Sequence, residues 1–146
     1  MIDQGFYRLK KSVYDDIIGT LSSDIPEKGG IIGCDSQGII CAFHYDKNPA
    51  QSTVSSYCPN VDYLNEIINS TWLDKGIMFA GFVHTHLNNT QISQEDTEYA
   101  KKLLGCLNQQ YVLMGIVGLN RDGSLNELAW YNISKDECVC TEMRIF

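Results

Sequence analysis

Residues 76–86 read Gly-Ile-Met-Phe-Ala-Gly-Phe-Val-His-Thr-His, an apolar run that ends in two histidines. The continuous apolar stretch Ile77–Val83, preceded by Gly76, is typical of a β-strand that is buried on both faces. Residues two apart in an extended strand point to the same side, so His84 and His86 are expected to face one point where the strand leaves the core. This stretch therefore predicts a central strand and a pair of side chains that can share a ligand.

Helices and strands alternate on both sides of this run. Helices are expected from about Ser12 to Leu21, over Val61–Trp72, and from a cap at Ser93 to about Leu107. Further strands are expected over Phe6–Leu9, Gly30–Cys34, Ile39–Phe43, Tyr111–Leu119, Leu125–Ile133 and Val139–Ile145, the last three as an antiparallel meander. This interleaving predicts an α/β fold, a mixed β-sheet flanked by helices, in a single domain over residues 1–146.

The charge balance and the absence of long apolar segments narrow the class of protein. The chain has 146 residues and a formal net charge of -7, from 18 acidic against 11 basic side chains. This argues against a nucleic-acid-binding protein, which usually shows a basic stripe. No apolar run approaches the roughly 20 residues that span a bilayer. The start, Met1-Ile2-Asp3-Gln4, does not resemble a secretory signal. We therefore expect a cytoplasmic protein whose six cysteines are reduced thiols.

A metal site at the two histidines needs a third ligand, and Asp96 is the candidate. It follows the short polar loop Leu87–Ile92 and lies in the first turn of the helix that begins at Ser93, so the loop can fold it back toward the strand end. Two imidazoles and a carboxylate suit zinc and leave one tetrahedral position open, which is typical of a catalytic ion. Water bound there has its pKa lowered to about 7 and becomes a nucleophile. We predict one catalytic Zn²⁺ held by His84, His86 and Asp96.

Two further residues complete a hydrolytic site. Glu27 precedes the glycine-rich stretch Gly29-Gly30-Ile31-Ile32-Gly33, where glycines allow backbone or substrate to approach closely. There it can take a proton from the zinc-bound water and later pass it to a leaving amine. Ser93 can donate a hydrogen bond to the oxyanion that forms. The Ser-x-x-Asp pattern at 93–96 is also a capping box, and the two roles can coexist.

The same residues resemble the signature of the JAMM/MPN metalloprotease family. That signature is a glutamate, then His-x-His, a spacer and Ser-x-x-Asp, and the matching residues are Glu27, His84-Thr85-His86 and Ser93-Gln94-Glu95-Asp96. In addition, Pro26–Gly33 is similar to the first core strand of the family, and Gly81–His86 to the metal-bearing strand of its prokaryotic members. The resemblance extends from about the first helix to the last strands.

Two features depart from the family pattern. The spacer Leu87–Ile92 is one residue shorter than usual, and Leu87 stands where a proline often follows the second histidine. The resemblance implies a fold related to that of cytidine deaminases and cleavage at the C-terminus of ubiquitin or a ubiquitin-like protein. Prokaryotic members remove or process such modifiers or act on sulfur-carrier proteins, and some belong to antiphage operons. It thus implies a deubiquitinase-like zinc isopeptidase with a ubiquitin-like partner as substrate.

The alternative function is a catalytically silent MPN scaffold that binds partner proteins. Silent members usually lose the metal ligands, whereas this chain retains the three candidate ligands and the glutamate. A cytidine-deaminase-type enzyme also uses zinc and a glutamate, but that chemistry needs a Pro-Cys-x-x-Cys pair. The sequence has no such pair, because the cysteine beside a proline, Cys58, comes before Pro59. We therefore expect the isopeptidase.

Overall fold

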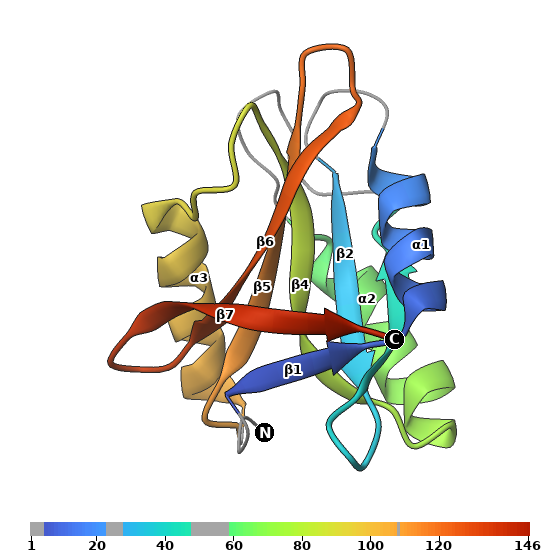
Figure 1. The fold of residues 1–146 in the computed structure, drawn as a ribbon. Helices are drawn as coiled ribbons and strands as arrows, with labels where there is room; N and C mark the ends of the chain where they lie inside the picture. Colours follow the sequence, from blue (N-terminus) through green and yellow to red (C-terminus); the bar gives the residue numbers. More distant parts are fainter. Residues whose placement is uncertain (1–4, 23–27, 48–58, 108) are drawn as a thin grey trace.

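The computed structural model describes residues 5–22, 28–47, 59–107 and 109–146. Its strands are β1 (Phe6–Leu9), β2 (Gly29–Cys34), β3 (Ile40–Tyr45), β4 (Met78–Leu87), β5 (Val112–Leu119), β6 (Leu125–Ile133) and β7 (Cys138–Ile145). Its helices are α1 (Lys11–Leu21), α2 (Val61–Ile67), which continues into the π-helical segment η1 (Ile68–Trp72), and α3 (Gln94–Cys106) (Figure 1). The predicted general base Glu27 lies outside the described residues.

The strands close into a barrel in the order β1-β3-β2-β4-β5-β6-β7. The first strand makes the closure, since it runs parallel to β7, with Phe6 opposite Glu142, and parallel to β3, with Leu9 opposite Ile40. The predicted α/β fold, a mixed sheet flanked by helices, is therefore wrong: the sheet closes on itself, and strand residues outnumber helical ones. The pairing of β1 with β7 joins opposite ends of the chain, which no local pattern in the sequence specifies.

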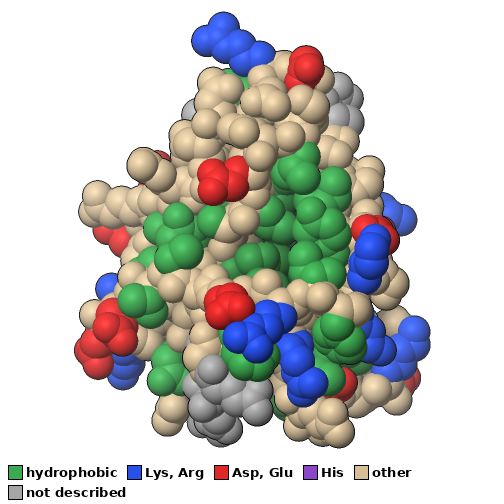
Figure 2. All heavy atoms as spheres, viewed as in Figure 1, with side chains coloured by type: hydrophobic (Ala, Val, Ile, Leu, Met, Phe, Trp, Pro, Cys, Tyr) green, Lys and Arg blue, Asp and Glu red, His purple; other side chains and the backbone are tan. Residues whose placement is uncertain are grey.

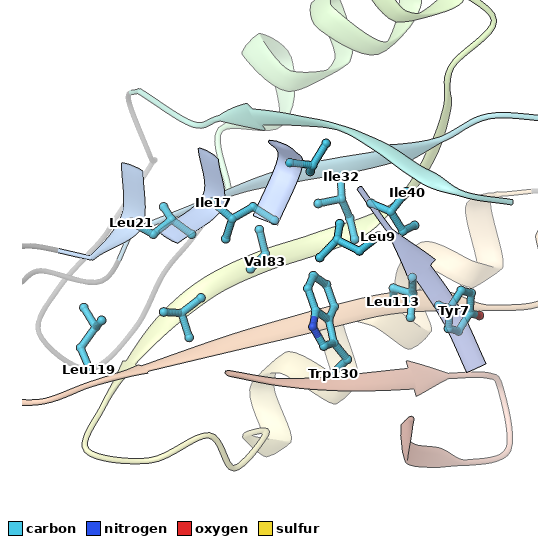
Figure 3. Packing of buried hydrophobic residues seen from close by; sticks show 12 residues of the cluster. Tyr7, Leu9, Ile17, Leu21, Ile32, Ile40, Val83, Leu113, Leu119 and Trp130 are labelled. Carbon is cyan, nitrogen blue, oxygen red and sulfur yellow. The ribbon is translucent and has the colours of Figure 1, made fainter. Parts of the chain in front are cut away.

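Buried side chains form two apolar clusters, one on each face of the central strands. Consecutive residues of a strand point to opposite faces. Ile32 and Val83 accordingly belong to the cluster that contains Ile17 of α1 (Figure 3). Their strand neighbours Ile31 and Phe82 belong to the second cluster, to which α2 and α3 contribute. The helices thus cover different faces of the strands, and α3 lies on the face that carries Phe82.

The strand β4 is central to this arrangement. It pairs antiparallel with β2 and parallel with β5. It also continues past the predicted end at Val83, so that His84 and His86 lie within the strand and not beyond it. Gly81 is required for this packing, because a Cβ there would lie 1.9 Å from the carbonyl oxygen of Leu113 in β5. By the alternation of the strand, both histidines point to the face that α3 covers.

The last three strands form the predicted antiparallel meander. β5 pairs antiparallel with β6 and β6 with β7, and every residue of β5 is buried. The connection between β5 and β6 is a tight turn, in which Gly123 donates its backbone N–H to the carbonyl of Asn120 at 2.9 Å. Through β5 this meander pairs with β4 along the edge opposite β2.

The described residues form a surface of mixed hydrophobic and charged side chains and carry free thiols. Figure 2 shows hydrophobic side chains gathered between β6 and α1, with acidic and basic side chains mixed around them. Among the described residues, no helix has the length and apolar character needed to cross a membrane. The cysteines in the described ranges are free thiols, namely Cys34, Cys41, Cys106, Cys138 and Cys140. The sixth, Cys58, lies outside those ranges.

Candidate metal centre

The structure brings His84, His86 and Asp96 together. The Nε2 atom of His84 lies 3.1 Å from Oδ1 of Asp96, and Nε2 of His86 lies 3.3 Å from Oδ2 of the same carboxylate. One donor atom from each of the three residues lies within 4.8 Å of the others. β4 supplies the two imidazoles, and the first turn of α3 supplies the carboxylate. The predicted ligands therefore form a group that can hold a metal ion.

The spacing of these donor atoms fits a small tetrahedral ion. Bonds of about 2.0–2.1 Å at tetrahedral angles separate neighbouring ligand atoms by about 3.3 Å. The two nitrogen–oxygen separations, 3.1 and 3.3 Å, are close to this value. Each imidazole is therefore at a suitable distance from the carboxylate, and the three ligand atoms lie within 4.8 Å of one another.

The protein environment keeps the carboxylate of Asp96 ionised. Burial raises the pKa of Asp96, but hydrogen bonds and positive charge from His84 and His86 outweigh it and hold that pKa well below its usual range. The side chains of His84 and Asp96 are only 3% and 15% exposed. Metal binding requires an ionised carboxylate and neutral imidazoles. The acid is thus already in the form that binds a metal.

Ser93 fixes Asp96 through the start of α3. Its Oγ accepts a hydrogen bond from the backbone N–H of Asp96 at 3.0 Å, and its own backbone N–H donates to Oδ2 of Asp96 at 3.3 Å. The predicted capping box is therefore confirmed. Because Oγ serves as an acceptor in the cap, its proton is still available for donation to another group. The oxyanion role of Ser93 stays a prediction.

A contact that sequence reasoning missed lies between the two histidines. The backbone N–H of Lys28 donates to Oγ1 of Thr85 at 3.0 Å, and the backbone N–H of Thr85 donates to the carbonyl of Lys28 at 2.9 Å. Thr85 is 2% exposed. The only sequence signal for this contact is that Thr85 stands between the two histidines, a position where a hydroxyl is unexpected in a buried strand. The start of β2 is therefore tied to the metal-bearing segment.

The third histidine has a different partner. Nε2 of His44, in β3, lies 2.7 Å from the hydroxyl of Tyr63 in α2, and the two rings are in contact. Burial lowers the pKa of His44, and the charge of Lys47 lowers it further. His44 therefore links α2 to the barrel and is not a member of the group formed by the other two histidines.

Comparisons with known proteins show that the fold of this chain is similar to that of several solved structures. No family description matches this sequence, and no curated protein matches it. Among solved structures, a protein of Desulfitobacterium hafniense has a TM-score of 0.74 at 16% identity, over 96% of this chain and 92% of that chain. A protein of Salinibacter ruber has a TM-score of 0.60 at 16% identity, over 95% and 91%. A JAB1/MPN domain protein of Archaeoglobus fulgidus has a TM-score of 0.52 at 15% identity, over 96% and 97%.

These identities establish similarity of fold and nothing finer. The chain has a fold similar to that of a JAB1/MPN domain protein, and it carries a group of two histidines and an aspartate that can bind a metal ion. This likeness of fold agrees with the MPN-like fold that the sequence resemblance implies.

Proposed function

We propose that this protein is a zinc-dependent peptidase of the JAMM type, which cleaves a peptide or isopeptide bond at the C-terminus of a ubiquitin-like protein. The observation that carries the proposal is the convergence of His84, His86 and Asp96 from two separate elements. Two imidazoles with one carboxylate are a donor set of catalytic zinc sites, in which the fourth position stays open. The fold similarity to a JAB1/MPN domain protein supports the same class.

A zinc ion held by His84, His86 and Asp96 would supply Lewis acidity, which would polarise a carbonyl and activate water near neutral pH. The remaining chemistry belongs to the chain. Ser93 lies next to the ligand group through its cap on Asp96, and its hydroxyl proton can be donated to a substrate oxygen. The backbone of Lys28 is anchored beside both histidines at Thr85, and Glu27 is the residue that precedes it. This supports Glu27 as the group that accepts and returns a proton.

The proposed substrate is the extended C-terminal tail of a ubiquitin-like modifier, attached to a target or present in a precursor. The chain is to be incubated with ubiquitin-like fusion proteins, with and without a chelator, and cleavage at the junction is to be followed by mass spectrometry. Cleavage that a chelator stops and zinc restores is expected. Partner binding without cleavage of any fusion would instead favour the silent scaffold.

Zinc is expected to stabilise the fold. A ligand that binds only the native state at about 1,000 times its dissociation constant adds about 4 kcal/mol to the free energy of unfolding. For a chain of this size each kcal/mol raises Tm by about 2–4 °C, so a rise of about 8–16 °C is expected. Thermal unfolding of chelator-treated protein, after removal of the chelator and with or without zinc in excess of the protein, measures this shift. Magnesium, which prefers oxygen ligands, is the control and should have little effect.

Replacement of Ser93 separates its two roles. Ser93→Ala is expected to lower the stability by about 1 kcal/mol through loss of the cap. It should also lower kcat by about 100-fold or more through loss of an oxyanion donor. Ser93→Thr retains both the hydroxyl and the cap and is the matched control. If Ser93→Ala lowers Tm while kcat stays at the level of Ser93→Thr, then Ser93 acts only as a cap.

A further inference from the structure

We propose that Tyr131 is a positioning residue for the metal centre. Its hydroxyl holds the loop Asn88–Ile92, which joins the histidine-bearing strand to the helix that carries Asp96. This inference rests on the metal site of the proposed function, and it adds a residue from β6, an element that contributes no ligand.

Tyr131 contacts the loop through its side-chain hydroxyl. Its hydroxyl donates a hydrogen bond to the backbone carbonyl of Thr90 at 2.7 Å, although the two residues are 41 positions apart in the sequence. The ring packs against the apolar cluster under α3, which fixes the direction of the side chain. Burial raises the pKa of Tyr131, which agrees with a hydroxyl that keeps its proton and donates it. The hydroxyl thus holds the loop at Thr90, three residues before Ser93.

A second set of contacts lies between the loop and β5. Gly118 pairs with His86 across the two strands, and a Cβ at Gly118 would lie 2.9 Å from the carbonyl oxygen of Asn89. The loop therefore passes directly over β5 beside the second histidine. Asn88 adopts a φ of 68°, in the left-handed region, and donates its backbone N–H to the carbonyl of Leu119. The loop is consequently held at its start by β5 and at Thr90 by Tyr131.

The position of the loop end determines the position of the ligand. Ser93 follows Ile92, and its backbone N–H bonds the same Oδ2 of Asp96 that faces His86. A shift of the loop end would therefore move the carboxylate relative to both imidazoles. The nearby hydroxyl of Thr90 is a weaker tether, since it reaches Glu127 at 3.3 Å and both groups face solvent. The half-buried hydroxyl of Tyr131 is therefore the stronger of the two contacts that hold Thr90.

The test compares two tyrosine-to-phenylalanine variants that each lose one hydroxyl. Tyr131→Phe is expected to weaken zinc binding about three- to tenfold, the effect of one lost hydrogen bond. Tyr7→Phe is the control, because the Tyr7 hydroxyl bonds the buried side chain of Asn132 at 2.8 Å. Asn132 pairs with Leu113, which in turn lies opposite Gly81, at the part of β4 away from His86. Zinc affinity is measured by competition with a chromophoric chelator, and the ligand geometry by the visible spectrum of the Co²⁺-loaded protein.

The expected result is a weaker zinc affinity and a changed Co²⁺ spectrum for Tyr131→Phe alone, with both variants folded by circular dichroism. Gly118→Ala, which displaces the same loop from the β5 side, should change the spectrum in a similar way. The inference is overturned if Tyr131→Phe binds zinc and Co²⁺ as the parent protein does, or if Tyr7→Phe weakens zinc binding equally. Failure of the parent protein to bind zinc would instead overturn the proposed function, and this inference with it.

Discussion

Replacement of His86 by alanine is expected to abolish tight metal binding while the chain still folds. His86 supplies one of the two imidazoles that face Asp96, at 3.3 Å, and its side chain is 12% exposed, so truncation leaves no sealed cavity. Four-ligand zinc sites bind with about 10–16 kcal/mol, so one ligand contributes roughly 3 kcal/mol, or at least a 100-fold change in affinity. Zinc content after dialysis should fall from one ion per chain toward zero, and hydrolysis should be lost.

The third histidine provides the control for this experiment. His44→Ala removes an imidazole that is bonded to Tyr63 and lies outside the ligand group. It should lower Tm through loss of the contact between β3 and α2, yet retain one zinc ion per chain. A His86→Ala protein that keeps zinc with the affinity of the parent would show that the ion, if bound at all, is held elsewhere.

Glu27→Gln is expected to separate catalysis from metal binding. Glutamine has the size of glutamate but cannot accept a proton at neutral pH, so the general base is lost while the ligands remain. Such a loss lowers turnover by about 100- to 10,000-fold. Cleavage of a ubiquitin-like fusion should fall by this factor, while zinc content and the Co²⁺ spectrum stay those of the parent protein.

Glu95→Gln is the matched control for this variant. Glu95 is an exposed acid in the first turn of α3, directly before the ligand Asp96, and the structure gives it no part in the ligand group. It should leave turnover within a few fold of the parent. Equal losses for both variants would indicate a general effect of charge near the site, and an unchanged turnover for Glu27→Gln would remove Glu27 from the mechanism.

The ligand group could be predicted from the sequence because its determinants are local. The spacing of His84 and His86 on an extended strand places both imidazoles on one side. The pattern from Ser93 to Asp96 begins a helix and simultaneously directs a carboxylate toward its N-terminal end. Only the short loop between these motifs separates strand from helix, so that few arrangements were open to the chain.

The closure of the barrel could not be predicted in this way. It depends on pairing of β1 with both β7 and β3, and the contact with β3 is confined to the register of Leu9 with Ile40. A four-residue strand carries too little pattern to indicate its partners. The role inferred for Tyr131 could not be predicted either, because its hydroxyl bonds a backbone carbonyl 41 residues away. Every residue has a backbone carbonyl, so the residue types do not indicate this partner. Local motifs and the pairing of consecutive strands could thus be predicted from this sequence, whereas the pairing of β1 with distant strands could not.

The carboxylate of Asp96 has two roles: it faces the histidines, and it closes the capping box of α3. Fraying of the first helical turn and release of the ion are therefore linked equilibria. Any substitution that favours an intact first turn should raise the affinity for zinc, even at a position that touches neither the ion nor a ligand. Conversely, zinc should slow hydrogen exchange of the backbone amides at the start of α3 more than elsewhere in that helix.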